Sequence, residues 1–389
     1  MNKKEIAELK RLFHPDRTPI TRVCGCYVDG EKQKKAHMKD AFLSLSDEEM
    51  YKYFDIFKKT LSGSLGRNLL NMEFPLSQET EGGTQEYLMK LKKSQLTDDA
   101  LLEEFYDKVI ETFLYPENYY IVLIHGMYDI PKKGTDGLEM FDASDDVYEF
   151  LLCSICPVKL TKPGLCYNEM TNTIEERTRD WFVEPPVTGF LFPAFNERNT
   201  DIHSVLYYSK NPEELNSDFA NLLLGCELPP TAAAQKDTFN TLVAETLQDE
   251  CTYETVRTIH ETLNSILDER KDEPDPVFLD KNDVKRLLCE NGAPEDTLAH
   301  FDEEYEQAGG DSQAPLCVSN VVNRRRFEIK TPSITIQVSP ECADLVETRI
   351  LDGRPYFVIP ADDSVEVNGI PVRPPMVNLP SDPSDETDV

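Results

Sequence analysis

The sequence predicts an α+β fold: an N-terminal sheet packed with helices, a helical middle subdomain and a small C-terminal β-rich module. Two helix-spaced segments come first, and short apolar runs rich in aromatic and branched residues follow them. Helical spacing then returns, and the last quarter of the chain alternates like strands. We predict these divisions: 1–45, a basic N-terminal segment; 46–211, an α+β domain; 212–309, a helical subdomain; 316–373, a β-rich module; 374–389, a disordered tail.

Composition limits the class of protein. The 389 residues include 72 acids against 40 bases, a formal charge of -32 that opposes indiscriminate coating of DNA and attraction to membranes. The start, Met1–Glu5, is charged, and the apolar run at 119–124 is far shorter than the roughly 20 residues that span a bilayer. Ten cysteines without an export signal are expected to be reduced thiols. We expect a cytoplasmic protein, with the nucleoid as an alternative location, and neither a membrane partner nor a cofactor.

The first 39 residues are basic against the acidic whole, with ten Lys or Arg and five Asp or Glu. Ile6, Leu9 and Leu12 fall at helical spacing and predict a short amphipathic helix before a turn at 14–16. Lys34 and Lys35 are candidate contacts for an anionic partner. The alternative is a solvated basic face on a helix that packs against the body.

The next elements are two helices joined by a glycine-containing loop. Ser46 and Glu49 form a capping-box pattern that predicts a helix over about 47–61. The loop at 62–68 could offer N–H groups to a phosphate, but it lacks the P-loop pattern, and the alternative is an ordinary helix-ending loop. Thr97 or Asp98 can cap a second helix.

Apolar runs bounded by Pro, Gly and Asp predict buried strands at 119–127, 147–158, 189–195 and 204–209. Further helices are predicted from apolar spacing, one of them ending near Gly225 and others around 239–247, 256–267, 280–291 and from 294. The C-terminal strands are predicted at 327–330, 334–338 and 349–359, where Asp352-Gly353 is a hairpin signal.

Four cysteines are weak candidates for a zinc site. Cys24 and Cys26 form one close pair, and Cys153 and Cys156 form another. In a strand, however, residues three apart point to opposite faces, whereas zinc ligands pair on turns. We therefore predict buried apolar thiols and no metal.

His125 is the candidate catalytic histidine, because it lies at the end of an apolar strand beside Gly126. It could serve as a base in an unrecognised active site, and the alternative is a hydrogen-bonded core histidine. None of the usual catalytic signatures is present, so an enzyme is the less favoured class.

Arg324, Arg325 and Arg326, with Lys330, form the densest positive charge of the C-terminal half. Guanidiniums can grip phosphates, and in an extended segment Arg324 and Arg326 would share a face. The alternative is pairing with carboxylates of the acidic body.

Two stretches, Thr21–Lys32 and Leu61–Phe74, resemble those of an uncharacterised bacterial domain-of-unknown-function family that would cover nearly the whole chain. More distantly, the order of features is similar to the 37-kDa nucleoid-associated proteins. It includes the two long apolar strands, the run Asp218–Glu227 and the closing Arg326–Lys330 segment with its hairpin. That resemblance implies association with chromosomal DNA by an acidic protein, although no DNA-contacting residue transfers from it.

The leading hypothesis is a non-enzymatic protein that binds DNA or RNA through local basic surface, at Arg324–Arg326, Lys330, Lys34 and Lys35. One alternative is an interaction scaffold whose acidic helical region docks basic proteins. Another is an enzyme with a site near His125. The sequence leaves the oligomeric state open.

Overall fold

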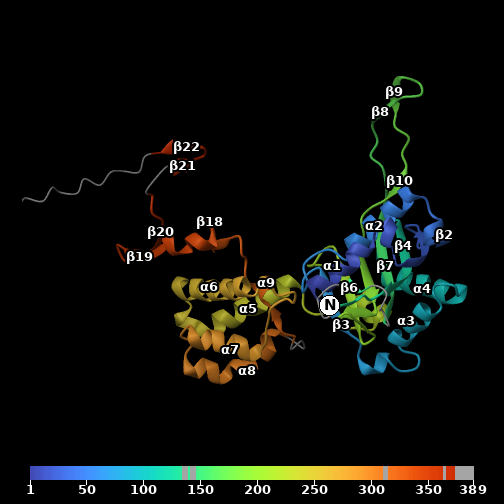
Figure 1. Ribbon diagram of the computed structural model, residues 1–389. Coiled ribbons are helices and arrows are strands. Elements are labelled where there is room, and N and C mark those ends of the chain that lie inside the picture. The colour runs from blue at the N-terminus through green and yellow to red at the C-terminus, as the bar shows by residue number, and fades with distance from the viewer. Residues whose placement is uncertain (134–138, 141–145, 310–313, 362–364, 373–389) are drawn as a thin grey trace, which may run out of the picture.

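The computed structural model describes residues 1–133, 139–140, 146–309, 314–361 and 365–372. Its N-terminal half is built on one antiparallel sheet with the strand order β2-β1-β4-β7-β11-β14-β3 and with β10 also paired to β7 (Figure 1). The strands are β1 Ile20–Val28, β2 Lys34–Ala41, β3 Leu69–Glu73, β4 Tyr119–Asp129, β7 Val147–Leu160, β10 Trp181–Val183, β11 Thr188–Phe192 and β14 Ser204–Ser209.

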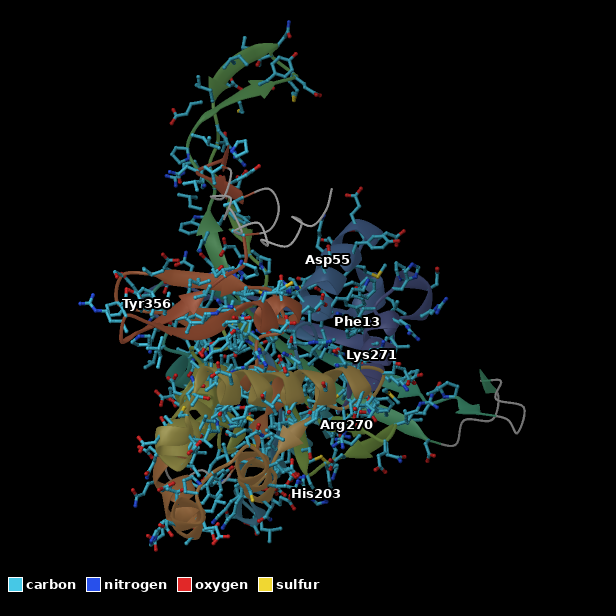
Figure 2. All side chains as sticks on the ribbon, turned by 90° about the vertical axis from the view of Figure 1, so that its left-hand side faces the viewer. Phe13, Asp55, His203, Arg270, Lys271 and Tyr356 are labelled. Atoms are coloured by element: carbon cyan, nitrogen blue, oxygen red, sulfur yellow. The ribbon has the colours of Figure 1, made fainter. Side chains whose placement is uncertain are left out.

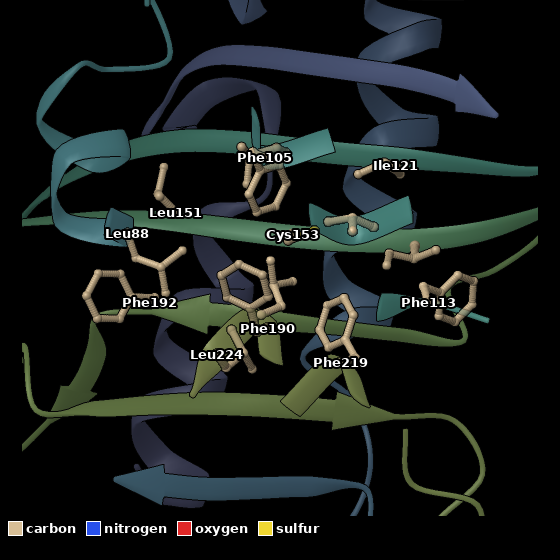
Figure 3. Packing of buried hydrophobic residues seen from close by; sticks show 14 of the residues in the cluster. Leu88, Phe105, Phe113, Ile121, Leu151, Cys153, Phe190, Phe192, Phe219 and Leu224 are labelled. Carbon is tan, nitrogen blue, oxygen red and sulfur yellow. The ribbon is translucent and has the colours of Figure 1, made fainter. Parts of the chain in front are cut away.

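Both faces of this sheet are covered. Alternate residues of β4 belong to two different cores: Ile121 and Leu123 pack on one face, and Val122 and Ile124 on the other. The helices α1 (Lys3–Leu12) and α2 (Asp47–Thr60) cover the second face. The first face, drawn in Figure 3, is covered by α3 (Thr84–Lys93), α4 (Asp99–Thr112) and the π-helical turn η5 (Phe219–Leu224). Burial on both faces explains why the central strands are continuously apolar.

Most predicted elements of this half are confirmed. The helix of 47–61 is α2, with Ser46 and Glu49 in a capping box, and Asp98 caps α4. The four predicted strands appear as β4, β7, β11 and β14. The strand predicted over 189–195 ends at Phe192, because Pro193 has no N–H to continue the ladder.

The sheet also contains strands that the sequence did not predict. β1 lies between β2 and β4, so residues within the predicted basic segment 1–45 are part of the sheet. β2 is mostly exposed, and its run Lys34–Ala41 is polar, so it carries little strand pattern. The helix predicted to end near Gly225 is instead the short turn η5, closed by Gly225 with φ 68°.

A long hairpin leaves the sheet where β7 and β10 end. Residues 161–180 continue past Leu160 and Trp181, and they carry the short pair β8 (Leu165–Asn168) and β9 (Thr173–Glu176) far from the body (Figure 1).

The helical part is a small bundle with its own core. It contains α5 (Ala232–Leu247), α6 (Tyr253–Glu269), α7 (Lys281–Glu290), α8 (Glu295–Gly309) and the short α9 (Val318–Val321). Asp280 caps α7 as predicted. Three hairpins follow: β17 (Phe327–Lys330) with β18 (Thr335–Val338), β19 (Glu347–Leu351) with β20 (Arg354–Val358), and β21 (Val365–Val367) with β22 (Ile370–Val372). The predicted Asp352-Gly353 turn joins β19 to β20 with both residues at positive φ.

The remaining elements are short. The predicted tail 374–389 lies outside the described residues. The short elements are β5 Lys132–Lys133, β6 Glu139–Met140, β12 Ala194–Asn196, β13 Asn199–Asp201, β15 Phe278–Leu279, β16 Leu316–Cys317, and the 3-10 turns η1 Pro15–Arg17, η2 Phe42–Ser44, η3 Leu76–Gln78, η6 Gln248–Glu250 and η7 Pro340–Leu345.

The loop at 62–68 joins the two parts of the molecule. The carbonyl oxygen of Gly66 accepts a hydrogen bond of 2.9 Å from Asn320 Nδ2 of α9. A Cβ at Gly66 would lie 3.0 Å from Cys317 Sγ, and its φ of 76° also favours glycine. Gly66, one of the two glycines of the loop considered as a phosphate site, therefore serves close packing against the helical part.

Candidate nucleic-acid interface

A hollow of about 350 Å³ opens between α5, α6 and the β17–β18 hairpin. Lys236 and Asn240 lie one helical turn apart on α5, and Val256 and His260 lie one turn apart on α6, so each pair presents one helix face. Arg326 comes from the segment just before β17. The hollow is lined by Lys236, Asn240, Val256, His260, Val321, Asn323, Arg326, Phe327, Glu328 and Gln337.

A second hollow of about 130 Å³ continues from the first, and the two share Asn240, Val256 and His260. Its other lining residues are mainly apolar: Phe239, Val243, Ala244, Cys251 and Ile259. We call the two joined hollows the α5–α6 groove. One end of this groove is polar and carries cations, and the other end is apolar.

The polar end has a positive bias in a protein of charge -32. Within the part of the chain that the structure describes, Lys236 and Arg326 form no ion pair. The one carboxylate in the lining, Glu328, accepts a hydrogen bond from Gln337 Nε2 at 3.5 Å. Asn240, Asn323 and Gln337 add amide groups that can both donate and accept.

His260 lies at the junction of the two hollows. Its ring meets the ring of Phe327 edge-on, with centroids 5.6 Å apart. Burial lowers the pKa of His260, and the nearby charge of Lys236 lowers it further. The imidazole is therefore neutral at pH 7 and would gain charge if an anion arrived beside it.

The predicted basic residues do not form one surface. Arg324 is ion-paired with Asp268 at the end of α6, whereas Arg326 lines the groove, so these two arginines do not act as a pair. Arg325 and Lys330 are exposed and form no ion pair among the described residues.

The N-terminal candidates are neutralised by carboxylates. Lys34 Nζ lies 2.7 Å from both Glu103 and Asp107, and Lys35 Nζ lies 2.9 Å from Asp29. These lysines belong to β2, which lies on the opposite side of the molecule from the β17–β18 hairpin (Figure 1). Lys236 was not among the predicted residues, because it is a lone cation on its helix. The i, i+4 spacing of Lys236 and Asn240 is the only sequence pattern that would place Lys236 beside another polar side chain of the groove.

His125 is fully buried and hydrogen-bonded at both ring nitrogens. Nε2 lies 3.0 Å from Glu149 Oε1, and Nδ1 lies 2.6 Å from Thr21 Oγ1. Because a carboxylate only accepts, Nε2 donates to Glu149, and the other nitrogen of a neutral ring accepts from the Thr21 hydroxyl. Burial lowers the pKa of His125 although Glu149 opposes this, so the ring is neutral at pH 7.

Glu149 also accepts from Lys92 Nζ at 2.8 Å. Burial favours a raised pKa for Glu149, but the hydrogen bonds from Lys92 and His125 outweigh burial and lower it. This Lys92–Glu149–His125 network leaves no imidazole nitrogen free to act on a substrate.

The four candidate zinc ligands lie in the sheet core. Cys24, Cys26 and Cys153 belong to the core under α3 and α4, whereas Cys156 lies three residues beyond Cys153 in β7 and points to the other face. Burial raises the pKa of Cys24 to about 11 and that of Cys26 to about 12. Among the described residues no group of His, Cys, Asp and Glu is arranged to hold a metal ion.

No described helix has the length and apolar character needed to span a bilayer. The fold is that of an α/β/α protein with an antiparallel central sheet, to which a helical bundle with a cation-lined groove is attached. The chain belongs to the family called domain of unknown function (DUF4317), whose model matches residues 1–370. This confirms the predicted membership of an uncharacterised family. Searches of curated proteins and of solved structures found no match. The match gives no support to the more distant resemblance to the nucleoid-associated proteins.

Proposed function

We propose that this protein is a non-enzymatic nucleic-acid-binding protein that holds a single strand in the α5–α6 groove. The observation that carries the proposal is the pair Lys236 and Arg326, two cations without a carboxylate partner among the described residues, at the mouth of an apolar hollow. The predicted binding surface is therefore narrowed from scattered basic residues to one groove.

The chemistry of the groove matches that of a nucleotide unit. A phosphate can accept from the guanidinium of Arg326 and from the ammonium of Lys236, and charge-assisted bonds of this kind are the strong ones. The base can enter the apolar end, against Val243 and Ile259, with His260 as a ring to stack on. The amides of Asn240 and Asn323 can bond the base edge.

A single strand fits this surface better than a duplex. The unpaired cations are few, and the body around them is acidic, so the regular phosphate rows of a duplex would be repelled. A flexible strand can place one phosphate at Arg326 and turn its base inward, as single-strand binding requires. Arg325 and Lys330, both exposed, can contact neighbouring phosphates. If the strand is DNA, the nucleoid is the expected location.

The test is fluorescence anisotropy of short labelled oligonucleotides with the purified full chain. Single-stranded DNA, single-stranded RNA and matched duplexes are titrated at salt concentrations from about 50 to 200 mM. We expect single strands to bind more tightly than duplexes, with affinity that falls as salt rises. Replacement of both Lys236 and Arg326 by Ala should flatten the logarithmic salt slope by about 0.7 for each lost phosphate contact.

Two results would overturn the proposal: no binding of any oligonucleotide at the lowest salt, or binding that is unchanged in the Lys236→Ala, Arg326→Ala double variant. Retention of a basic protein by a chain that binds no oligonucleotide would favour the alternative function, a scaffold that docks basic partners on its acidic helices.

A further inference from the structure

We infer that the acidic tail, residues 374–389, occupies the α5–α6 groove of its own chain, so that a nucleic-acid strand must displace the tail in order to bind. The tail lies outside the described residues. Its sequence matches the described groove in charge, in the order of its residues and in length. Displacement by nucleic acid rests on the proposed function, whereas the place of the tail in the groove does not.

The tail and the polar end of the groove carry opposite charges. The tail contains no Lys or Arg, and its four acids are Asp382, Asp385, Glu386 and Asp388. At the polar end, Lys236 and Arg326 form no ion pair within the described part of the chain, and the lining holds one acid, Glu328. A body of charge -32 repels an acidic segment over most of its surface, so local cations decide where the tail can lie.

The tail also carries apolar residues ahead of its acids. Met376, Val377 and Leu379 all precede the first of the four acids. The apolar end of the groove, which includes Val243 and Ile259, offers these side chains a surface. The tail therefore joins an apolar run to an acidic run, as the groove joins an apolar hollow to a cationic one.

The two runs come in the order in which the chain reaches the two hollows. The rings of Phe357 of β20 and Tyr253 of α6 lie edge to face with centroids 5.5 Å apart, which holds the β19–β20 hairpin at the N-terminal end of α6. Figure 2 shows Tyr356 of this hairpin and Arg270, just beyond α6, on opposite sides of the bundle. The apolar hollow lies at the hairpin's end, because Cys251 in its lining comes just before α6. A chain that continues from this hairpin therefore meets the apolar hollow first and the cations second.

The lengths agree as well. Val243 and Lys236 are seven residues apart on α5, about 10 Å at 1.5 Å per residue. Leu379 and Asp382 are three residues apart, which in an extended chain is also about 10 Å at ~3.3 Å per residue. From Val372, the last described residue, the chain can reach up to about 33 Å to Asp382, which exceeds the length of α6.

Because the tail is tethered to its site, a weak contact is sufficient. A segment joined to its site by a short linker has an effective concentration on the order of 1 mM. A tail with a dissociation constant of about 0.3 mM as a separate peptide would therefore fill the groove about three quarters of the time, and would lower the apparent affinity for a strand about fourfold. A contact this weak exchanges quickly, so groove residues such as Cys251 stay accessible to small reagents.

The place of the tail is tested by cross-linking the unchanged full chain with a water-soluble carbodiimide, which joins a lysine amine to a carboxylate in contact with it. After proteolysis of the monomer, mass spectrometry should find Lys236 joined to one of the four tail acids. Lys34, whose Nζ lies 2.7 Å from Glu103 and Asp107, supplies the control links in the same sample. About 1 M salt should remove the Lys236 link, because the screening length falls to about 3 Å.

The link between Lys236 and the tail must form within one chain. Its absence from a sample in which the Lys34 links form would overturn the inference, and so would a link found only between two chains.

Displacement is tested by anisotropy of labelled single strands with a neutral-tail variant, Asp382→Asn, Asp385→Asn, Glu386→Gln and Asp388→Asn. We expect this variant to bind about fourfold more tightly than the unchanged chain at the lowest salt, since the groove is then open. A matched variant has the same net charge but neutralises four exposed acids that form no ion pair among the described residues: Asp55→Asn, Glu81→Gln, Glu111→Gln and Glu169→Gln. It should gain less than about twofold, because distant exposed charges are screened.

Circular dichroism should show that both variants are folded. Equal gains in the two variants, or no gain in the neutral-tail variant, would overturn displacement by the tail. If no chain binds an oligonucleotide, the proposed function fails, and the Lys236 cross-link still decides whether the tail lies in the groove.

Discussion

Asn320 Nδ2 donates to the carbonyl oxygen of Gly66 at 2.9 Å, across 254 residues of chain. The same amide lies 3.1 Å from Gln235 Oε1, which also accepts from the backbone N–H of Cys317. One buried side chain therefore ties the sheet part of the molecule to α5 of the bundle that carries the groove.

Replacement of Asn320 by Ala should destabilise the protein by about 1–3 kcal/mol, because the buried side-chain oxygen of Gln235 and the half-buried carbonyl oxygen of Gly66 each lose a donor. Chemical denaturation followed by circular dichroism measures this. Asn240→Ala, at an exposed position of the same bundle, should stay within about 0.5 kcal/mol of the unchanged protein. Equal effects of the two substitutions would contradict the structural role given to Asn320.

Thiol reactivity should follow burial. Of the ten cysteines, Cys251, Cys289 and Cys342 are exposed and Cys166 is half-buried, whereas the other six are buried. Buried thiols with raised pKa, such as Cys24 at about 11, hold little thiolate at neutral pH. Titration of the native protein with a chromogenic disulfide should show three fast groups and a slower fourth, and ten groups after unfolding. Rapid reaction of all ten thiols in the native protein would contradict the burial of six of them.

Acidification should weaken the fold through His125. Its pKa is lowered in the folded state relative to about 6.5 when unfolded, so the folded state binds fewer protons and stability rises with pH. The stability that the neutral His125 ring contributes is fully present above pH 6.5 and is lost as the pH falls below that value. We expect the melting temperature of the unchanged protein to fall between about pH 7.5 and 5.5 more steeply than that of His125→Gln.

The neutral substitution should itself cost about 1–3 kcal/mol at pH 7.5, because Glu149 or Thr21 loses a partner. Identical pH profiles for the two proteins would show that His125 is not held neutral. His260, whose pKa burial lowers, and His203, whose pKa is raised because its ring donates a hydrogen bond to Glu79, are present in both proteins, so their effects cancel in the comparison.

Oligonucleotide binding should tighten on acidification. Burial lowers the pKa of His260 in the free groove, and the charge of Lys236 lowers it further, with Glu328 the only acid in the lining. A bound phosphate would favour the protonated ring. Anisotropy titrations at pH 5.5 and 7.5 should show higher affinity at the lower pH for the unchanged chain. The His260→Asn variant should show a smaller pH effect, and an undiminished effect would remove His260 from the site.

The sequence predicted the core better than the site for physical reasons. β4 and β7 are buried on both faces, so their composition alone marks them as strands. β2 is an edge strand that pairs with β1, and the polar composition of Lys34–Ala41 does not identify it as a strand. The groove was not predicted, because its cations come from α5 and from the segment before β17, which are brought together only by folding. Arg324 and Lys34 drew attention as dense charge, yet their carboxylate partners lie far away in sequence.

The most direct measurement compares two double variants at one low salt concentration, with labelled single-stranded DNA and RNA. Lys236→Ala with Arg326→Ala removes the unpaired cations of the α5–α6 groove, and Lys34→Ala with Lys35→Ala removes two cations already paired with acids. We expect the groove variant to lower affinity by about 10-fold or more, because hydrogen bonds to charged groups contribute roughly 1.5 kcal/mol or more. The Lys34 and Lys35 variant should change affinity little. Equal losses, or none from the groove variant, would contradict the assignment of nucleic-acid binding to this groove.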